Sequence, residues 1–232
     1  MKPMDISSVN APSYAKERTD KIRRFSATER LFHWSFALPQ IVLMITGGWL
    51  LAIAALSGEN TVKTDLVIIH KMAAACFILA PVLIFMNGNA KVLIKNIMLA
   101  LTWSRKDFQW LYLSFLKLVI PSTRLPEAGK FNAGQKLNML LAMTLGGGFI
   151  ISGLFMWFLD GVLLAWFIHA ASFLFVLFMV SGHIYMAILH PSTRPSFWAI
   201  INGNVDRNWA CHHHSQWAEN LEENSANEDN NS

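Results

Sequence analysis

The sequence has little charge, and four long stretches have none. Only 15% of the 232 residues are charged and 53% are hydrophobic, whereas an average soluble domain is about 25% charged. Asp, Glu, Lys and Arg are all absent from residues 31–58, 72–90, 137–159 and 161–193. A membrane-spanning helix needs about 20 apolar residues. The sequence therefore predicts an all-α membrane protein with four transmembrane helices, and it argues against a disordered, collagen-like or nucleic-acid-binding chain.

Cysteine is also scarce, which limits the cofactors that the chain can hold by itself. Cys76 lies inside an apolar run and Cys211 in a polar segment, so the two thiols are expected at different depths without a disulfide. Two thiols cannot build a zinc or iron–sulfur site. The first 30 residues contain no apolar core, so no cleavable signal peptide is expected.

The basic residues are distributed unevenly between the two sides of the predicted membrane. Seven Lys and Arg lie in residues 1–30, eight in residues 89–136 and two after residue 190. The two remaining connections contain only Lys63 and Lys71. Since basic residues stay on the cytoplasmic side, both termini and the middle connection are predicted to be cytoplasmic.

This pattern divides the chain into three parts. Residues 1–25 are expected to form a polar arm, residues 26–190 the four-helix domain, and residues 191–232 a cytoplasmic tail with a disordered acidic end. Helices are expected near 26–56, 65–86, 135–159 and 163–189. Ser26 to Glu29 has the spacing of a capping box at the first helix. Alternating apolar and basic residues in 91–120 predict an amphipathic inner loop lying on the membrane surface.

Four of the eight histidines fall inside the predicted spans, where ionisable residues are costly and usually functional. His33 lies near the inner end of its helix and His70 near the outer end of the next. His169 and His183 are 14 residues apart, or about 21 Å along one face of the last helix. The depths therefore match His33 with His183 on the inner side and His70 with His169 on the outer side.

Two imidazoles that face each other without carboxylates or thiols suit the axial positions of a haem iron. Zinc would require three or four ligands at each level, and each level offers two. Glycines in the spans would leave room for a flat macrocycle, although close helix packing alone would also explain them. His190 is interpreted as an interfacial residue, and His212, His213 and His214 as a solvated basic patch beside Arg207.

Several segments resemble the gamma subunit, a cytochrome b, of membrane-bound, quinone-linked formate dehydrogenases. The resemblance covers roughly residues 25–217 and is strongest at Asn132-Ala133-Gly134-Gln135-Lys136. The other segments are Arg30–Trp34, Ile69-His70, Gly129–Phe131, Ile168–Ala171, His183–Ala187 and Ile201–Val205, followed by Trp209.

The resemblance implies two haem b groups with His33, His70, His169 and His183 as ligands of the haem irons. It also implies a site for quinone, menaquinone or ubiquinone, lined by Asn132, Gly134 and Gln135 near the inner haem. These residues lie where the third span begins, and free N–H groups at a helix N-terminus can donate to a quinone carbonyl. A simple helix cap is the alternative interpretation.

By the same resemblance, the chain is a multi-pass subunit of the bacterial cytoplasmic (inner) membrane. Electrons would come from a periplasmic iron–sulfur beta subunit, and a molybdenum or tungsten alpha subunit would oxidise formate. The equivalent cytochrome b of a hydrogenase or of a sulfur-compound reductase is the first alternative. A histidine-lined transporter is the second, but it would need carboxylates within the spans, and these are absent. A membrane anchor would not need histidines matched in depth.

Overall fold

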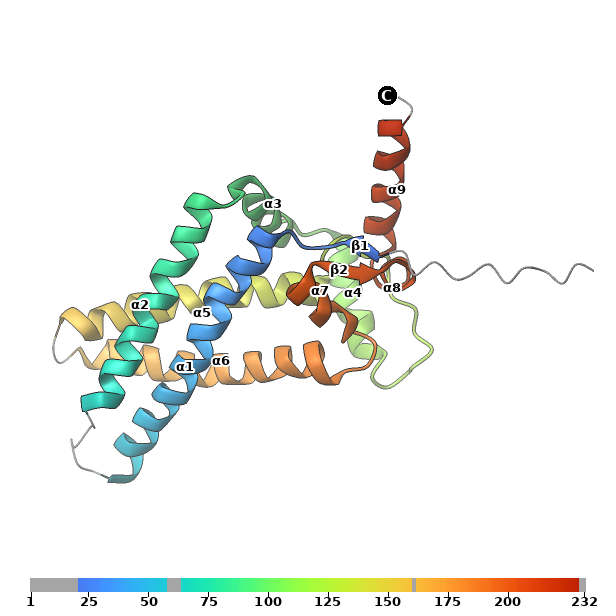
Figure 1. The fold of residues 1–232 in the computed structure, drawn as a ribbon. Coiled ribbons are helices and arrows are strands. Elements are labelled where there is room, and N and C mark those ends of the chain that lie inside the picture. The colour runs from blue at the N-terminus through green and yellow to red at the C-terminus, as the bar shows by residue number, and fades with distance from the viewer. Residues whose placement is uncertain (1–20, 58–63, 160–161, 230–232) are drawn as a thin grey trace, which may run out of the picture.

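The computed structural model describes residues 21–57, 64–159 and 162–229. The chain is almost entirely helical, with one small sheet (Figure 1). The elements in chain order are β1 (Lys21–Arg23), α1 (Ala27–Ser57), α2 (Thr64–Asn87), α3 (Ala90–Leu101), α4 (Arg105–Leu116), α5 (Ala133–Phe158), α6 (Leu163–Ile184), the π-helix η1 (Tyr185–Leu189), α7 (Pro195–Asn202), β2 (Asn204–Asp206), α8 (Arg207–His213) and α9 (Ser215–Asp229).

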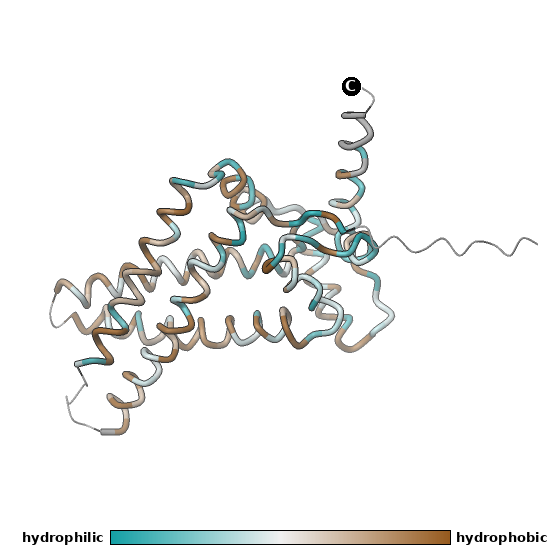
Figure 2. The backbone as a smooth tube through the Cα atoms, viewed as in Figure 1, coloured by the Kyte–Doolittle hydropathy of each residue, from teal (hydrophilic) through white to brown (hydrophobic). Residues whose placement is uncertain are grey.

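Four helical segments are long and apolar enough to cross a membrane: α1, α2, α5, and α6 continued by η1. Their ends lie within two residues of those expected from the sequence, so the predicted four-helix membrane fold is confirmed. Hydrophobic residues recur along the whole length of these helices (Figure 2). Many of their large apolar side chains are exposed, as expected for helices that face lipid.

The spans form two helical hairpins, because α1 packs along α2 and α5 packs along α6. The hairpins cross one another, and α1 also contacts α6 (Figure 1). Most of the outer loop expected at 57–64 lies outside the described residues. The turn expected at Asp160-Gly161 lies wholly outside them. This arrangement brings α2 and α6, which carry His70 and His169, to the same region of the bundle.

The amphipathic inner loop predicted between the second and third spans consists of α3 and α4. On α3, Leu93 and Ala100 are buried while Lys91 and Lys95 are exposed. Asn89 caps α3 by accepting a hydrogen bond from the Val92 N–H. A capping box of Ser104 and Asp107 opens α4. Both helices contact α5, so the inner loop packs beside the start of the third span.

The first described strand and the last described helices fold together into a unit, here called the terminal lobe, which comprises β1, α7, β2, α8 and α9. Strands β1 and β2 pair antiparallel, with Ile22 opposite Val205. The cluster of Ala199, Val205 and Ala210 forms the core of this lobe. The sequence predicted a polar arm over residues 1–25 and a tail over residues 191–232, and β1 and β2 join parts of both in one small sheet.

The acidic segment near the C-terminus is helical as far as Asp229, where the sequence analysis expected a disordered end. The first turns of α9 are anchored, since Ala218 is buried and Trp217 packs on the core of the terminal lobe. From this anchor the helix projects away from the rest of the molecule (Figure 1). The apolar residues at its start thus explain a helix that the acidic composition alone did not predict.

Candidate functional site

The four intramembrane histidines lie in two pairs, in the combinations expected from their depths. The rings of His33 on α1 and His183 on α6 have centroids 6.3 Å apart and planes inclined by 44°. The rings of His70 on α2 and His169 on α6 also have centroids 6.3 Å apart, with planes inclined by 74°. Each pair therefore joins side chains from two different helices.

This ring spacing suits a metal ion bound between the two imidazoles. Bonds from imidazole to zinc are about 2.0–2.1 Å long, so a metal ion between two facing rings places their centroids roughly 6 Å apart. Within the described residues, no three His, Cys, Asp or Glu side chains gather around one point. A bis-histidine haem iron fits such a pair, whereas a zinc ion would lack ligands.

A largely apolar cavity of about 450 Å³ surrounds the outer pair. Its volume falls within the range of small-molecule and cofactor sites, about 300–1,000 Å³. Both outer histidines line it, together with Gly47, Gly153 and the half-buried Lys71. The Lys71 ammonium lies 5.2 Å from the centre of the Trp157 ring, which lines the same cavity. The cavity can therefore receive a flat apolar cofactor that carries carboxylates.

Two glycines allow the outer histidine rings to lie against the neighbouring helix. A Cβ atom on Gly47 would stand 3.2 Å from Cε1 of His70, and one on Gly153 would stand 3.3 Å from Cε1 of His169. These distances are tighter than ordinary van der Waals contact. The glycines are therefore needed for the present positions of the rings.

Hydroxyl groups next to these glycines contact the outer rings. Thr46 Oγ1 lies 2.8 Å from Nδ1 of His70, and Ser152 Oγ lies 3.0 Å from Nδ1 of His169. Thr46 and Ser152 are both buried. In each ring this contact occupies one nitrogen and leaves Nε2 for a metal ion.

The inner pair has different surroundings. Nδ1 of His33 is buried without a hydrogen-bond partner among the described residues. The next residue, Trp34, donates its indole N–H to the Ile200 carbonyl at 3.1 Å, which ties α1 to the terminal lobe. After His183 the chain changes from α-helix to the π-helix η1, a distortion that occurs frequently at functional sites.

The predicted quinone residues form the N-terminal cap of α5. Asn132 accepts a hydrogen bond from the Gln135 N–H at 2.9 Å, and Gln135 accepts one from the Asn132 N–H at 3.1 Å. This reciprocal pattern is a capping box. A Cβ on Gly134 would stand 3.3 Å from the Trp110 ring of α4, so this glycine admits the indole close to the cap.

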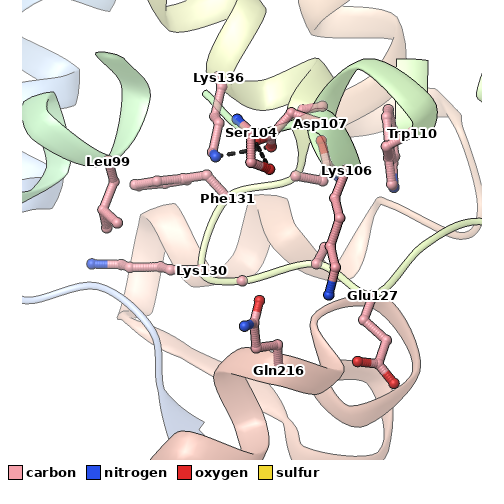
Figure 3. A pocket seen from close by; sticks show the side chains of 14 residues that line it. Leu99, Ser104, Lys106, Asp107, Trp110, Glu127, Lys130, Phe131, Lys136 and Gln216 are labelled. Atoms are coloured by element: carbon pink, nitrogen blue, oxygen red, sulfur yellow. Dashed lines mark hydrogen bonds and ion pairs between the residues drawn. The ribbon is translucent and has the colours of Figure 1, made fainter. Parts of the chain in front are cut away.

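A polar cavity of about 170 Å³ lies beside this cap (Figure 3). The Lys136 ammonium on one wall is 2.8 Å from a carboxylate oxygen of Asp107. Burial raises the pKa of Asp107, but hydrogen bonds from Lys136 and Ser104 outweigh this effect and hold the pKa below its ordinary value. Lys130, Asn132 and Trp110 also line the cavity. Ionised side chains therefore surround the cap on its polar side.

A buried arginine of the terminal lobe holds the segment that leads to the cap. Arg24 donates to the Lys130 carbonyl at 3.1 Å and to Nε2 of His214 at 2.9 Å, while Nδ1 of His214 donates to the Gly129 carbonyl at 2.8 Å. Burial lowers the pKa of Arg24 to about 9. Burial and, next, the Arg24 charge lower the pKa of His214 to about 3. A neutral His214 thus joins the arginine to the loop.

Comparison with known proteins assigns these features to a family. The sequence model of the prokaryotic cytochrome b561 family matches residues 24–203, which include all four paired histidines. The chain belongs to this family. It is therefore a membrane cytochrome b of the electron-transfer type, and the cofactor that the family implies is haem b. Four spans make this cytochrome b561 a multi-pass membrane protein.

Individual relatives point in the same direction. This cytochrome b561 is 28% identical over 126 residues to the cytochrome b556(Fdn) subunit of the nitrate-inducible formate dehydrogenase of Escherichia coli K12. That alignment covers 51% of the present chain and 57% of the relative. The present chain is also 22% identical over 217 residues to the cytochrome b556(fdo) subunit of the formate dehydrogenase of the same strain. This second alignment covers 87% of the present chain and 93% of the relative. The chain thus spans little more than half of the first relative's length.

Several residues of the candidate sites were not predicted from the sequence. Thr46, Ser152 and Lys71 lie beside the outer histidine pair. Arg24 and Trp110 contact the segment that forms the α5 cap. One expectation was wrong, because His214 is 1% exposed and does not belong to a solvated basic patch. His212 is exposed as expected. An arginine 190 residues away in the sequence donates a hydrogen bond to His214, and no local pattern could indicate that contact.

Proposed function

We propose that this cytochrome b561 transfers electrons from a formate dehydrogenase to a quinone through two haem b groups at different depths. The observation that carries the proposal is the pair of matched histidine couples, each with ring centroids 6.3 Å apart. His33 and His183 would hold the inner haem, and His70 and His169 the outer one. Bound haem would supply reversible one-electron transfer at each level, which the chain's own side chains cannot provide.

The outer cavity supports this assignment through its shape and charge. The walls are apolar apart from the histidines and a few other groups, among them Lys71. The Lys71 ammonium, positioned on the Trp157 ring, is the cation available to a haem carboxylate. An apolar cavity with one such cation at its border would bind an amphipathic macrocycle in a single orientation.

The quinone would bind at the inner end of the bundle, near Asn132, Gly134 and Gln135. The side-chain oxygens of Asn132 and Gln135 are used by the cap, so their amide N–H groups are the donors left for a quinone carbonyl. Reduction of one quinone to the quinol consumes two electrons and two protons. The polar cavity beside the cap, lined by Lys136 and Asp107, would provide water and protons from the cytoplasmic side.

The basic residues support a cytoplasmic location for this inner end in the bacterial inner membrane. Residues 26–190 would form the haem domain. The segments before and after it, 1–25 and 191–232, would be cytoplasmic. Electrons would enter on the periplasmic side from an iron–sulfur beta subunit, and a molybdenum or tungsten alpha subunit would oxidise formate. The relatives are formate dehydrogenase subunits by name, which favours this donor over a hydrogenase or a sulfur-compound reductase.

The test is purification of the complex that contains this chain, followed by three measurements. We expect a pyridine haemochrome to give two haem b per chain, formate to reduce both haems, and a menaquinone analogue to reoxidise them. One haem per chain, or none, would contradict the proposal. A different co-purifying large subunit with two haems present would replace formate dehydrogenase as the donor but leave the haem assignment standing.

The quinone residues need a separate experiment in the same complex. Gln135→Ala and Asn132→Ala should slow quinone reduction roughly ten- to a hundredfold, since each removes a hydrogen bond worth about 1–3 kcal/mol. Both haems should remain bound and reducible by formate. Thr144→Ala, an exposed hydroxyl further along α5, is the control. Unchanged quinone turnover with intact haems would leave these residues as a helix cap only.

A further inference from the structure

The two outer histidines have the same contact on the neighbouring helix. On α1, the dipeptide Thr46-Gly47 packs against His70 of α2. On α5, the dipeptide Ser152-Gly153 packs against His169 of α6 in the same way. Each hairpin thus presents a hydroxyl and a glycine to the histidine of its second helix. The two hairpins therefore repeat one contact at the outer level.

The hydroxyl protons in both contacts are already used. Thr46 donates its hydroxyl proton to the Val42 carbonyl at 2.7 Å, and Ser152 donates to the Gly148 carbonyl at 2.7 Å. A hydroxyl group has one proton to donate and two lone pairs to accept with. With the hydroxyl proton on that carbonyl, each hydroxyl oxygen accepts from the histidine, and we assign the imidazole proton to Nδ1.

The position of this proton defines the tautomer of the His70 and His169 rings. With a proton on Nδ1, a neutral imidazole has its free lone pair on Nε2. A metal ligand needs that lone pair, and a hydrogen bond from the other N–H holds the ring in place and makes it a stronger electron donor. The buried hydroxyls of Thr46 and Ser152 thus prepare His70 and His169 as ligands.

We propose that Thr46 and Ser152 are positioning residues that lower the midpoint potential of the outer haem. This inference rests on the proposed function, in which His70 and His169 hold that haem. Stronger donation from the ligands stabilises ferric over ferrous iron, so the potential falls. The inner ligand His33 has no such partner at Nδ1 among the described residues. A lower potential at the outer haem would favour electron flow toward the inner one.

The experiment uses the full chain in its complex and titrates both haems through their visible bands. Thr46→Val and Ser152→Ala remove one hydroxyl each and should raise the outer midpoint potential without moving the inner one. The shift in the reduction equilibrium should be severalfold, where tenfold corresponds to about 59 mV for one electron. Thr46→Ser and Ser152→Thr keep the hydroxyl and should restore the original potential. His70→Ala identifies the outer haem in the titration.

The chain offers matched controls. Thr144 and Ser181 are exposed hydroxyl residues that donate to the carbonyl four residues earlier, as Thr46 and Ser152 do, but within the described part of the chain neither hydrogen-bonds to a histidine ring. Ser181 is even followed by a glycine, Gly182. Thr144→Val and Ser181→Ala should leave the outer potential unchanged.

The outcomes separate this inference from the proposed function. Fewer than two haems in the unmodified chain would contradict the proposed function itself. Two haems with an unchanged outer potential in both hydroxyl variants, or a shift confined to the inner haem, would overturn the inference alone. If the Thr46→Val variant fails to bind the outer haem, the Thr46→Ser variant provides the test. The inference is supported if Thr46→Ser binds the outer haem at the original midpoint potential, and it is overturned if Thr46→Ser also loses that haem.

Discussion

Small side chains decide how the large histidine rings lie in this cytochrome b561. Gly47 and Gly153 permit the outer rings to approach the helix backbone, and the neighbouring hydroxyls hold them there. His33 lacks this support at Nδ1 among the described residues. The two histidine pairs are therefore equal in spacing but differ in their surroundings, and changes to single residues should affect one pair at a time.

The first prediction concerns the pairing of the haem ligands. His70→Ala and His169→Ala should each remove the same outer haem, because either change leaves the iron with one axial ligand. His33→Ala and His183→Ala should each remove the inner haem. Visible spectra and a pyridine haemochrome of the purified variants measure which haem is lost. Removal of different haems by two members of one pair would contradict the pairing.

The second prediction concerns pH and His214. Its pKa is about 3 in the folded protein against 6.5 ordinarily, so between these values only the unfolded chain binds the extra proton. The free energy of unfolding should therefore fall as the pH drops from 6.5 toward 3, by at most about 1.4 kcal/mol per pH unit. His214→Asn should reduce this slope. Thermal unfolding in detergent at several pH values measures it.

The exposed His212 is the control for this experiment, and His212→Asn should keep the original slope. Since His214 holds the Gly129 carbonyl, protease cleavage of the loop before α5 should also increase at low pH. A slope that is the same in the His214 variant would show that other groups cause the acid sensitivity.

At the scale of elements, one buried ion pair connects the start of the bundle to the inner loop. Glu29 in the first turn of α1 accepts hydrogen bonds from Lys130 and from Asn96 of α3. It also closes the predicted capping box, accepting from the Ser26 N–H at 2.7 Å. Three separate segments thus meet at one carboxylate that is only 8% exposed.

The third prediction follows from this ion pair. Lys130→Met should destabilise the protein by about 3–5 kcal/mol, since it leaves the Glu29 carboxylate buried without its cation. The double variant Glu29→Gln with Lys130→Met should recover much of the loss, because no unpaired charge remains. Thermal or denaturant unfolding in detergent measures both. If the single variant Lys130→Met and the double variant are equally stable, the unpaired charge of Glu29 does not cause the destabilisation.

The sequence predicted the membrane-spanning helices more closely than the elements of the terminal lobe. The four spans were predicted closely because long runs without charge dictate their ends, and the histidine pairs followed from depth along these helices. The terminal lobe was not predicted, because β1 and β2 are three residues each and lie about 180 residues apart. The strands and contacts such as Arg24 with His214 join residues far apart in the sequence, which leave no local pattern.

The contacts of Thr46 and Ser152 were missed for a related reason. Hydroxyl residues occur in apolar helices without any functional role, because they can donate to a carbonyl of the preceding turn. Thr144 and Ser181 do only that. Only the packing of two helices distinguishes Thr46 and Ser152 from them.

For the whole molecule, the fourth prediction concerns orientation in the membrane. Reporter fusions after Gly58 and Asp160 should be active in the periplasm, and fusions after Lys106 and at the C-terminus should be active in the cytoplasm. The reason is the strong bias of Lys and Arg toward the termini and the inner loop. The opposite pattern would place the polar cavity beside α5 on the periplasmic side. Quinone reduction would then take up protons on that side.

The two proposed haem sites should also differ in their magnetic properties, because the ring planes are inclined by 74° in the outer pair but by 44° in the inner pair. Axial imidazoles that are nearly perpendicular leave two iron d orbitals almost equal in energy. Rings that are closer to parallel separate them. Electron paramagnetic resonance of the oxidised protein should therefore show two low-spin ferric signals, the outer one with the larger maximal g value. A His70→Ala variant should lose that signal and keep the other.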